Sequence, residues 1–183
     1  MGVSGVDEQN RAAASAPRQE KEYIFTGGYQ HSMDNKGRLI VPNPFRESLG
    51  PVFCIGPSFN FKAIALYPTS VWEKTRQQYK SLGAANSNLK MYLENFDAMS
   101  YRDQECDAQG RVLLPARLRI NLLGEEKDVD VLGSGEYIRI LSRKASADQF
   151  DSFMAALPDI LEALDRLGAA RDGIRQARSE QGE

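Results

Sequence analysis

A short motif that occurs twice constrains the fold of this chain more than any other feature. The first copy is Asp34–Pro42 (DNKGRLIVP) and the second is Asp107–Pro115 (DAQGRVLLP). A further arginine follows both copies at the same offset, at Arg46 and Arg119. Chance rarely places Asp, Gly, Arg, Pro and a second Arg in one register twice. The chain is therefore predicted to contain two copies of one unit of roughly 70 residues.

The repeat sets the predicted domain organisation. A first repeat is expected over residues 23–84, a linking helix over 85–97 and a second repeat over 98–157. Residues 1–22 contain few large apolar side chains, so they are expected to form a disordered arm that cannot bury enough surface to offset its ordering entropy. Residues 158–183 are expected to form a C-terminal helix and a tail.

Each motif is predicted to combine a turn with a short buried strand. Asp followed three residues later by Gly suits a type I turn, in which Gly supplies the positive φ at the end. The stretches that precede the turns, residues 25–33 and 98–106, are expected to form the other arm of a hairpin with the strand after the turn. Two more strands are predicted in each repeat, at 52–55 and 63–67 and at 129–132 and 137–141.

Helices are predicted between and after these strands, so the fold class is mainly β with helices, α+β by content. Short amphipathic helices are expected after the two motif prolines, over 44–49 and 116–123. Capping residues predict three longer helices: from Thr69 or Ser70 to Leu82, from Asn86 or Ser87 over 88–96, and from Ser146 to about Leu157. Helical spacing of apolar residues after Pro158 predicts a last helix that ends near Leu167 and frays beyond it.

Composition narrows the possible function classes. The chain has 183 residues and a net charge of −2, which excludes a uniformly basic nucleic-acid coat but leaves room for a small basic patch. Cys54, Cys106 and the single histidine, His31, lack zinc-type spacing, so no metal or cofactor is predicted and two reduced thiols in a cytoplasmic protein are expected. No apolar run is long enough to cross a membrane, so no membrane partner is expected.

The candidate functional residues lie in the two turns: Asp34, Lys36, Arg38, Asp107 and Arg111. A guanidinium offers a planar fork that matches phosphate oxygens or the major-groove edge of guanine. The Asp four residues earlier can hold that fork by an ion pair before a ligand arrives. The alternative is plain turn chemistry with an exposed Arg after a Gly, although turn chemistry does not demand Arg both times. The residues thus predict DNA as a partner.

The two loops differ in charge, and other readings of the same residues stay open. The first loop carries Lys36 where the second has Gln109, so the first is expected to be the stronger DNA contact and the second to serve more in packing between protomers. Asp34 and Asp107 also suggest a hydrolase with paired carboxylates, but no nucleophile or base recurs beside them, and the chain is interpreted as a non-enzyme. Two aromatic residues are expected in the core of their helices: Trp72 and Phe150.

The residues of three segments resemble the MraZ family of bacterial transcriptional regulators: Tyr29–Arg46, Leu66–Glu73 and Asp107–Arg119. With their spacing the resemblance covers roughly residues 25–156. A doubled Asp-x-x-Gly-Arg is specific for that family, whereas a single copy would also fit relatives such as AbrB and the MazE antitoxin.

The resemblance implies a double-split β-barrel of two pseudo-symmetric swapped-hairpin repeats within one chain. It implies a ring-shaped homo-oligomer in the nucleoid that binds G-rich direct repeats upstream of the division and cell-wall gene cluster. It also implies that Asp34 with Arg38 and Asp107 with Arg111 face the DNA, with Lys36 as a supporting contact. An antitoxin-like or scaffold ring that binds protein instead of DNA is the alternative.

Overall fold

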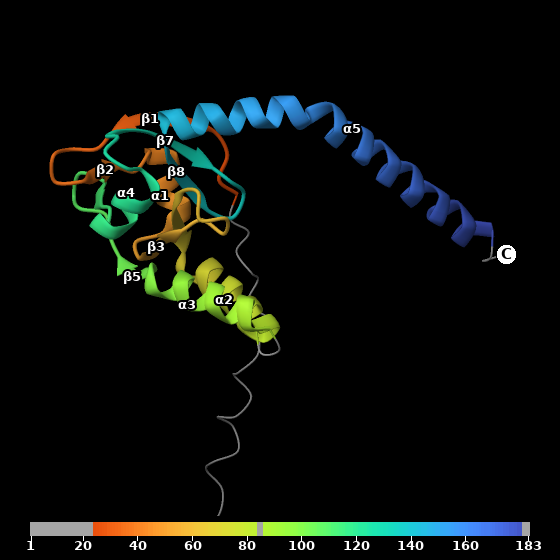
Figure 1. Cartoon of the computed structure of the whole chain (residues 1–183), viewed down its shortest axis with the longest axis horizontal. Helices are drawn as coiled ribbons and strands as arrows, with labels where there is room; N and C mark the ends of the chain where they lie inside the picture. Colours follow the sequence, from red (N-terminus) through yellow and green to blue (C-terminus); the bar gives the residue numbers. More distant parts are fainter. Residues whose placement is uncertain (1–23, 84–85, 181–183) are drawn as a thin grey trace, which may run out of the picture.

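The body of the protein consists of two antiparallel sheets (Figure 1). The computed structural model describes residues 24–83 and 86–180, so the predicted arm over 1–22 lies outside the described residues. The larger sheet has six strands in the order β1 (Gly28–Ser32), β7 (Asp128–Gly133), β8 (Ile138–Ser142), β4 (Ile64–Pro68), β3 (Phe53–Pro57) and β5 (Tyr101–Gln104). The smaller sheet pairs β2 (Arg38–Ile40) with β6 (Arg111–Leu113).

The two repeats exchange their strands, and the predicted local hairpins are wrong. β1 pairs with β7 of the second repeat and β5 pairs with β3 of the first, while β2 pairs with β6 across the two repeats. The reason is burial of the central apolar side chains of the two motifs. Leu39 lies opposite Val112, and their exposed fractions are 0% and 1%. Pairing across the repeats buries both side chains at once, which stabilises the ribbon.

The fold class is confirmed at the level of content. The described residues contain eight strands and five helices, which is α+β. Within them the strands form two separate sheets, and no ladder closes these into one barrel.

Two short helices follow the motifs and anchor them in the core. α1 (Asn43–Leu49) begins after Pro42 and α4 (Ala116–Leu122) begins after Pro115, close to the predicted ranges. Each helix buries one large side chain at the same repeat position, Phe45 at 2% and Leu118 at 0% exposure. The two helices therefore fix the orientation of the motifs relative to the sheet.

Two longer helices form an extension of the body (Figure 1). α2 (Thr69–Gly83) packs against α3 (Ser87–Ala98), which is capped by the Asn86 side chain at the backbone N–H groups of Asn88 and Leu89. The helix predicted over 88–96 and its cap by Asn86 are confirmed. A second core, half of whose buried residues are aromatic, fills the contact between these helices and the sheet: Cys54, Ala65, Tyr67, Val71, Trp72 and Phe96. Trp72 is 6% exposed, as expected.

The last helix differs most from the prediction. α5 (Arg143–Glu180) is one continuous helix that passes through Pro158 and does not end near Leu167. It begins before Ser146, and the Ser142 hydroxyl accepts from the N–H of Ala145 at 3.2 Å. The prediction gave too much weight to Pro and Gly, because an otherwise Ala- and Leu-rich segment has high helix propensity. Phe150 is 61% exposed and not in the core, since α5 leaves the sheet after its first turns (Figure 1).

Candidate functional site

The first loop, residues 34–38, is a turn in which one carboxylate accepts three N–H groups. Asp34 Oδ1 accepts from the backbone N–H groups of Lys36 and Arg38, each at 2.9 Å. Asp34 Oδ2 accepts from Arg38 Nε at 2.6 Å. The backbone closes the turn with bonds from Gly37 N to Asp34 O and from Asp34 N to Arg38 O. The guanidinium is thus held at a defined angle before any ligand binds.

The second loop, residues 107–111, repeats this geometry. Asp107 Oδ1 accepts from the backbone N–H groups of Gln109 and Arg111 at 2.9 Å each, and Asp107 Oδ2 accepts from Arg111 Nε at 2.8 Å. Gly37 and Gly110 have φ values of 78° and 74° at the same turn position. The turn chemistry predicted from the sequence is therefore confirmed in both copies.

These contacts change the pKa of both carboxyl groups. The backbone N–H of Arg38, followed by its guanidinium, lowers the pKa of Asp34 to about 2. The Arg111 guanidinium is the main group that lowers the pKa of Asp107. Both carboxylates stay charged at neutral pH, and their oxygens already accept N–H groups. They are poorly suited to act as a general acid or base, which weighs against the paired-carboxylate hydrolase.

The two loops lie at the two ends of the β2–β6 ribbon, because the strands that follow them pair antiparallel, with Arg38 opposite Leu113 and Arg111 opposite Ile40. Beyond the β2–β6 ribbon, Leu114 N donates to Gly37 O at 3.0 Å and Val41 N donates to Gly110 O at 2.9 Å. Both loops lie at the side of the body from which α5 runs away (Figure 1). One chain therefore presents two guanidinium groups, one at each end of the β2–β6 ribbon.

Two further arginines cover the loops, and each comes from the other repeat. Arg119 of α4 lies against Gly37 so closely that an added Cβ would overlap its guanidinium, and Arg46 of α1 lies against Gly110 in the same way. Arg119 Nε also donates to Leu114 O at 3.0 Å. The sequence reasoning did not place Arg46 or Arg119 in the site, although their matching offset after the two motifs was the signal that could have done so.

The first loop has one more basic neighbour than the sequence reasoning assigned. Lys127, just before β7, donates from Nζ to Asn35 Oδ1 at 2.8 Å. Its neighbours in the sequence, Glu126 and Asp128, are acidic, so the gain in local positive charge is small. The side chains of Arg38 and Arg111 are 33% and 27% exposed, which leaves each able to meet a ligand while its Asp holds it.

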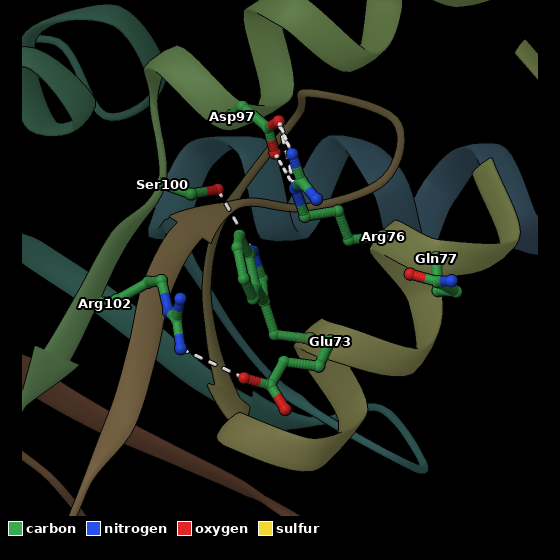
Figure 2. A pocket seen from close by; sticks show the side chains of 7 residues that line it. Glu73, Arg76, Gln77, Asp97, Ser100 and Arg102 are labelled. Atoms are coloured by element: carbon green, nitrogen blue, oxygen red, sulfur yellow. Dashed lines mark hydrogen bonds and ion pairs between the residues drawn. The ribbon is translucent and has the colours of Figure 1, made fainter. Parts of the chain in front are cut away.

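A separate polar cavity of about 550 Å³ lies where α2, α3 and β5 meet (Figure 2). Arg76 binds Asp97 through two nitrogens at 2.7 and 2.8 Å, and Arg102 binds Glu73 at 3.0 Å. The Trp72 ring lies near both guanidinium groups. Since the opposite charges are paired with one another, we interpret this cluster as the contact that fastens the helical extension to the sheet.

Other chemistry is sparse in the part of the chain that the structure describes. No group of three or more His, Cys, Asp or Glu side chains is placed to hold a metal ion there. Cys54 is buried, and burial raises the pKa of its thiol to about 12. Among residues 24–83 and 86–180, no helix is long and apolar enough to cross a membrane.

Comparison with known proteins gives one consistent result. A family model described as "MraZ protein, putative antitoxin-like" matches residues 24–95 and 99–160. A protein of Syntrophomonas wolfei named "Transcriptional regulator MraZ" is 31% identical over 145 residues, which are 79% of this chain and 99% of that protein. Proteins of the same name from Leuconostoc citreum and Heliobacterium modesticaldum are 33% and 31% identical, over 74% and 77% of this chain and 98% and 96% of their own lengths.

Proposed function

The chain belongs to the MraZ family of transcriptional regulators, and we propose that it binds DNA sequence-specifically through its two Asp-x-x-x-Arg loops. The observation that carries this proposal is the pair of loops, one at each end of the β2–β6 ribbon, in which Asp34 and Asp107 hold the partly exposed Arg38 and Arg111. Such forks match the O6 and N7 atoms of guanine as well as phosphate oxygens. Lys36 adds a positive charge for the DNA backbone.

Preorganisation explains why the loop contains an Asp at all. A carboxylate beside the binding group lowers the net positive charge and by itself weakens attraction to phosphate. Its benefit is that the guanidinium loses less conformational freedom when it meets a base edge. The arrangement therefore favours selective readout of bases over general affinity for the backbone.

Several copies are needed for strong binding. The net charge of −2 and two loops per chain give one protomer only modest affinity for DNA. We propose a ring-shaped homo-oligomer, with the exchanged strands arranged as a double-split barrel in each chain. Its loops would contact successive G-rich direct repeats upstream of the division and cell-wall gene cluster, so that linked contacts raise the overall affinity. Such a protein acts in the cytoplasm, at the nucleoid.

The test is titration of the DNA upstream of its own gene with the wild type and with Arg38→Ala. Loss of a bidentate contact to guanine should weaken specific binding by about 1–3 kcal/mol for each loop engaged. Arg166→Ala is the matched control, because Arg166 is an exposed Arg on α5 that forms an ion pair with Glu162 of the same helix. Unchanged affinity of a folded Arg38→Ala protein would contradict the loop assignment.

An antitoxin-like or scaffold ring that binds protein is the second candidate, favoured by the words "antitoxin-like" in the description of the family model. The dependence of DNA affinity on salt concentration distinguishes the two functions. Phosphate contacts release counterions, so log affinity falls steeply and linearly with log salt. A flat salt response, together with equal affinity for unrelated DNA, would favour the protein-binding ring.

A further inference from the structure

The exposed side of α5 carries an apolar stripe that no part of the described chain covers. Apolar side chains recur every seven residues in two registers, at Phe150, Leu157 and Leu164 and at Phe153, Ile160 and Leu167. Met154 and Leu161 widen the stripe on one side. Seven of these eight side chains are 40% to 67% exposed, and Leu157 is only partly exposed. A repeat of seven with two apolar positions is typical of a helix that packs against another helix as a coiled coil.

The area of the stripe is too large for a surface left bare in water. We take about 150–250 Å² as the accessible area of each large side chain. Multiplied by the exposed fractions and summed over the stripe, this leaves roughly 700 Å² of exposed apolar surface on one helix. The largest patch on a typical monomer is about 300–600 Å². Two such stripes in contact would remove at most about 1,400 Å² from water, and this upper limit falls within the roughly 1,200–2,000 Å² of a stable interface.

We propose that the α5 helices of two copies of this chain pack against each other along this stripe. A second copy presents a stripe of the same length, about 27 Å from Phe150 to Leu167 at 1.5 Å per residue, and the same seven-residue spacing. The polar residues Asp151, Asp159 and Asp165 lie at positions that stay outside such a contact. The stripe is therefore matched to itself along its whole length.

The direction of the pair follows from a groove of about 710 Å³ at the start of α5. Phe150 and Phe153 line this groove together with Gln30 and Leu132 of the sheet, so the body of the protein stands beside the first part of the stripe. A parallel partner would bring its own body to the same place. An antiparallel partner brings only the far end of its helix there, so we expect Phe153 of one copy to face Leu164 of the other.

The proposed α5 contact lies partly outside the residues that match the family model. The family model ends at residue 160, and the three relatives described above are covered almost completely by 74% to 79% of this chain. About half of the stripe lies at or beyond that end. The inference therefore does not depend on DNA binding by the loops, which lie at the side of the body from which α5 runs away (Figure 1).

The first test measures the mass of the full-length protein by light scattering. Ile160→Glu/Leu164→Glu places two carboxylates in the stripe, and the wild type should have at least twice the mass of this variant. Ser152→Glu/Ala155→Glu adds the same charge on the polar side of α5 and should keep the wild-type mass. Circular dichroism confirms that all three proteins keep their helix content. Equal mass for the wild type and the stripe variant would overturn the proposal.

Cross-linking tests the antiparallel direction. In a Cys106→Ser background, Phe153→Cys and Leu164→Cys proteins should form a disulfide with each other when mixed. Neither should cross-link with itself, because like positions would lie about 16 Å apart, eleven residues at 1.5 Å, beyond the reach of a disulfide. Self-cross-linking of each variant would overturn the antiparallel pair. Stripe-dependent sedimentation with phosphatidylglycerol vesicles, without a change in mass, would show a lipid contact instead and overturn the pairing.

Discussion

The arginine that covers the first loop can be tested through the glycine beneath it. Gly37 has a φ of 78°, and a Cβ added there would overlap the guanidinium of Arg119. In Gly37→Ala the backbone pays about 1–2 kcal/mol for a left-handed conformation. Arg119 must also move, which removes its bond to Leu114 O at a cost of about 0.5–1.5 kcal/mol. The free energy of unfolding should fall by about 1.5–3.5 kcal/mol, which lowers Tm by roughly 3–14 °C in a chain of this size.

A matched glycine separates the two costs. Gly124 has a φ of 67° and no atom within 4 Å of an added Cβ, so Gly124→Ala carries the backbone cost alone. Urea titration of both variants should show the larger loss for Gly37→Ala. In an Arg119→Ala background, Gly37→Ala should cost no more than Gly124→Ala. If the two glycine variants lose the same stability in the wild-type background, the Arg119 cover contributes nothing and this reasoning is refuted.

Three further predictions concern the loops. Arg38→Ala should reduce DNA affinity more than Arg111→Ala, because the first loop has Lys36 beside it, while Arg111→Ala should disturb assembly more. DNA titration measures the first effect and size-exclusion chromatography the second. Equal losses of affinity with intact oligomers would contradict this difference between the loops. Lys36→Ala should reduce the slope of log affinity against log salt by about 0.9, and an unchanged slope would remove Lys36 from the DNA contact. The Asp34 carboxyl group, whose pKa is lowered to about 2, stabilises the fold fully above its ordinary pKa near 3.8 and loses this effect as the pH falls through 2. Asp34→Asn should therefore be less sensitive to acid between pH 4 and pH 2 in unfolding titrations, and equal sensitivity would contradict the ion pair.

Local chemistry in the sequence was enough to predict the loops. The bonds of Asp34 and Asp107 reach residues no more than four positions away, so residue types and spacing determine them. The Asn86 cap was predictable for the same reason. Element positions followed from apolar patterns of the same short range, and most predicted ranges differ from the observed ones by only a few residues.

Pairing between distant segments was not predictable in the same way. β1 could form a hairpin with the strand after the turn or pair with β7, depending on which arrangement buries Leu39 and Val112. The alternation of apolar and polar residues along a single strand does not specify its partner strand. The exposure of Phe150 was not predictable for a similar reason. The sequence pattern of an apolar helix face is the same whether that face packs against the core of its own chain or lies exposed. The family resemblance implied the exchange of strands, whereas local turn chemistry predicted the opposite.

The exchange of strands makes the two loops one mechanical unit. The Arg of each motif lies on its own loop, but the strand that continues that loop pairs with the other repeat, and the glycine of that loop is covered by the other repeat's helix. A change in one loop therefore acts on the β2–β6 ribbon, which also holds the second loop. This coupling keeps two guanidinium groups at a fixed separation, because neither can shift alone. If the loops bind DNA as proposed, a fixed separation lets both guanidinium groups contact the duplex in one register, which two independently moving domains would not ensure.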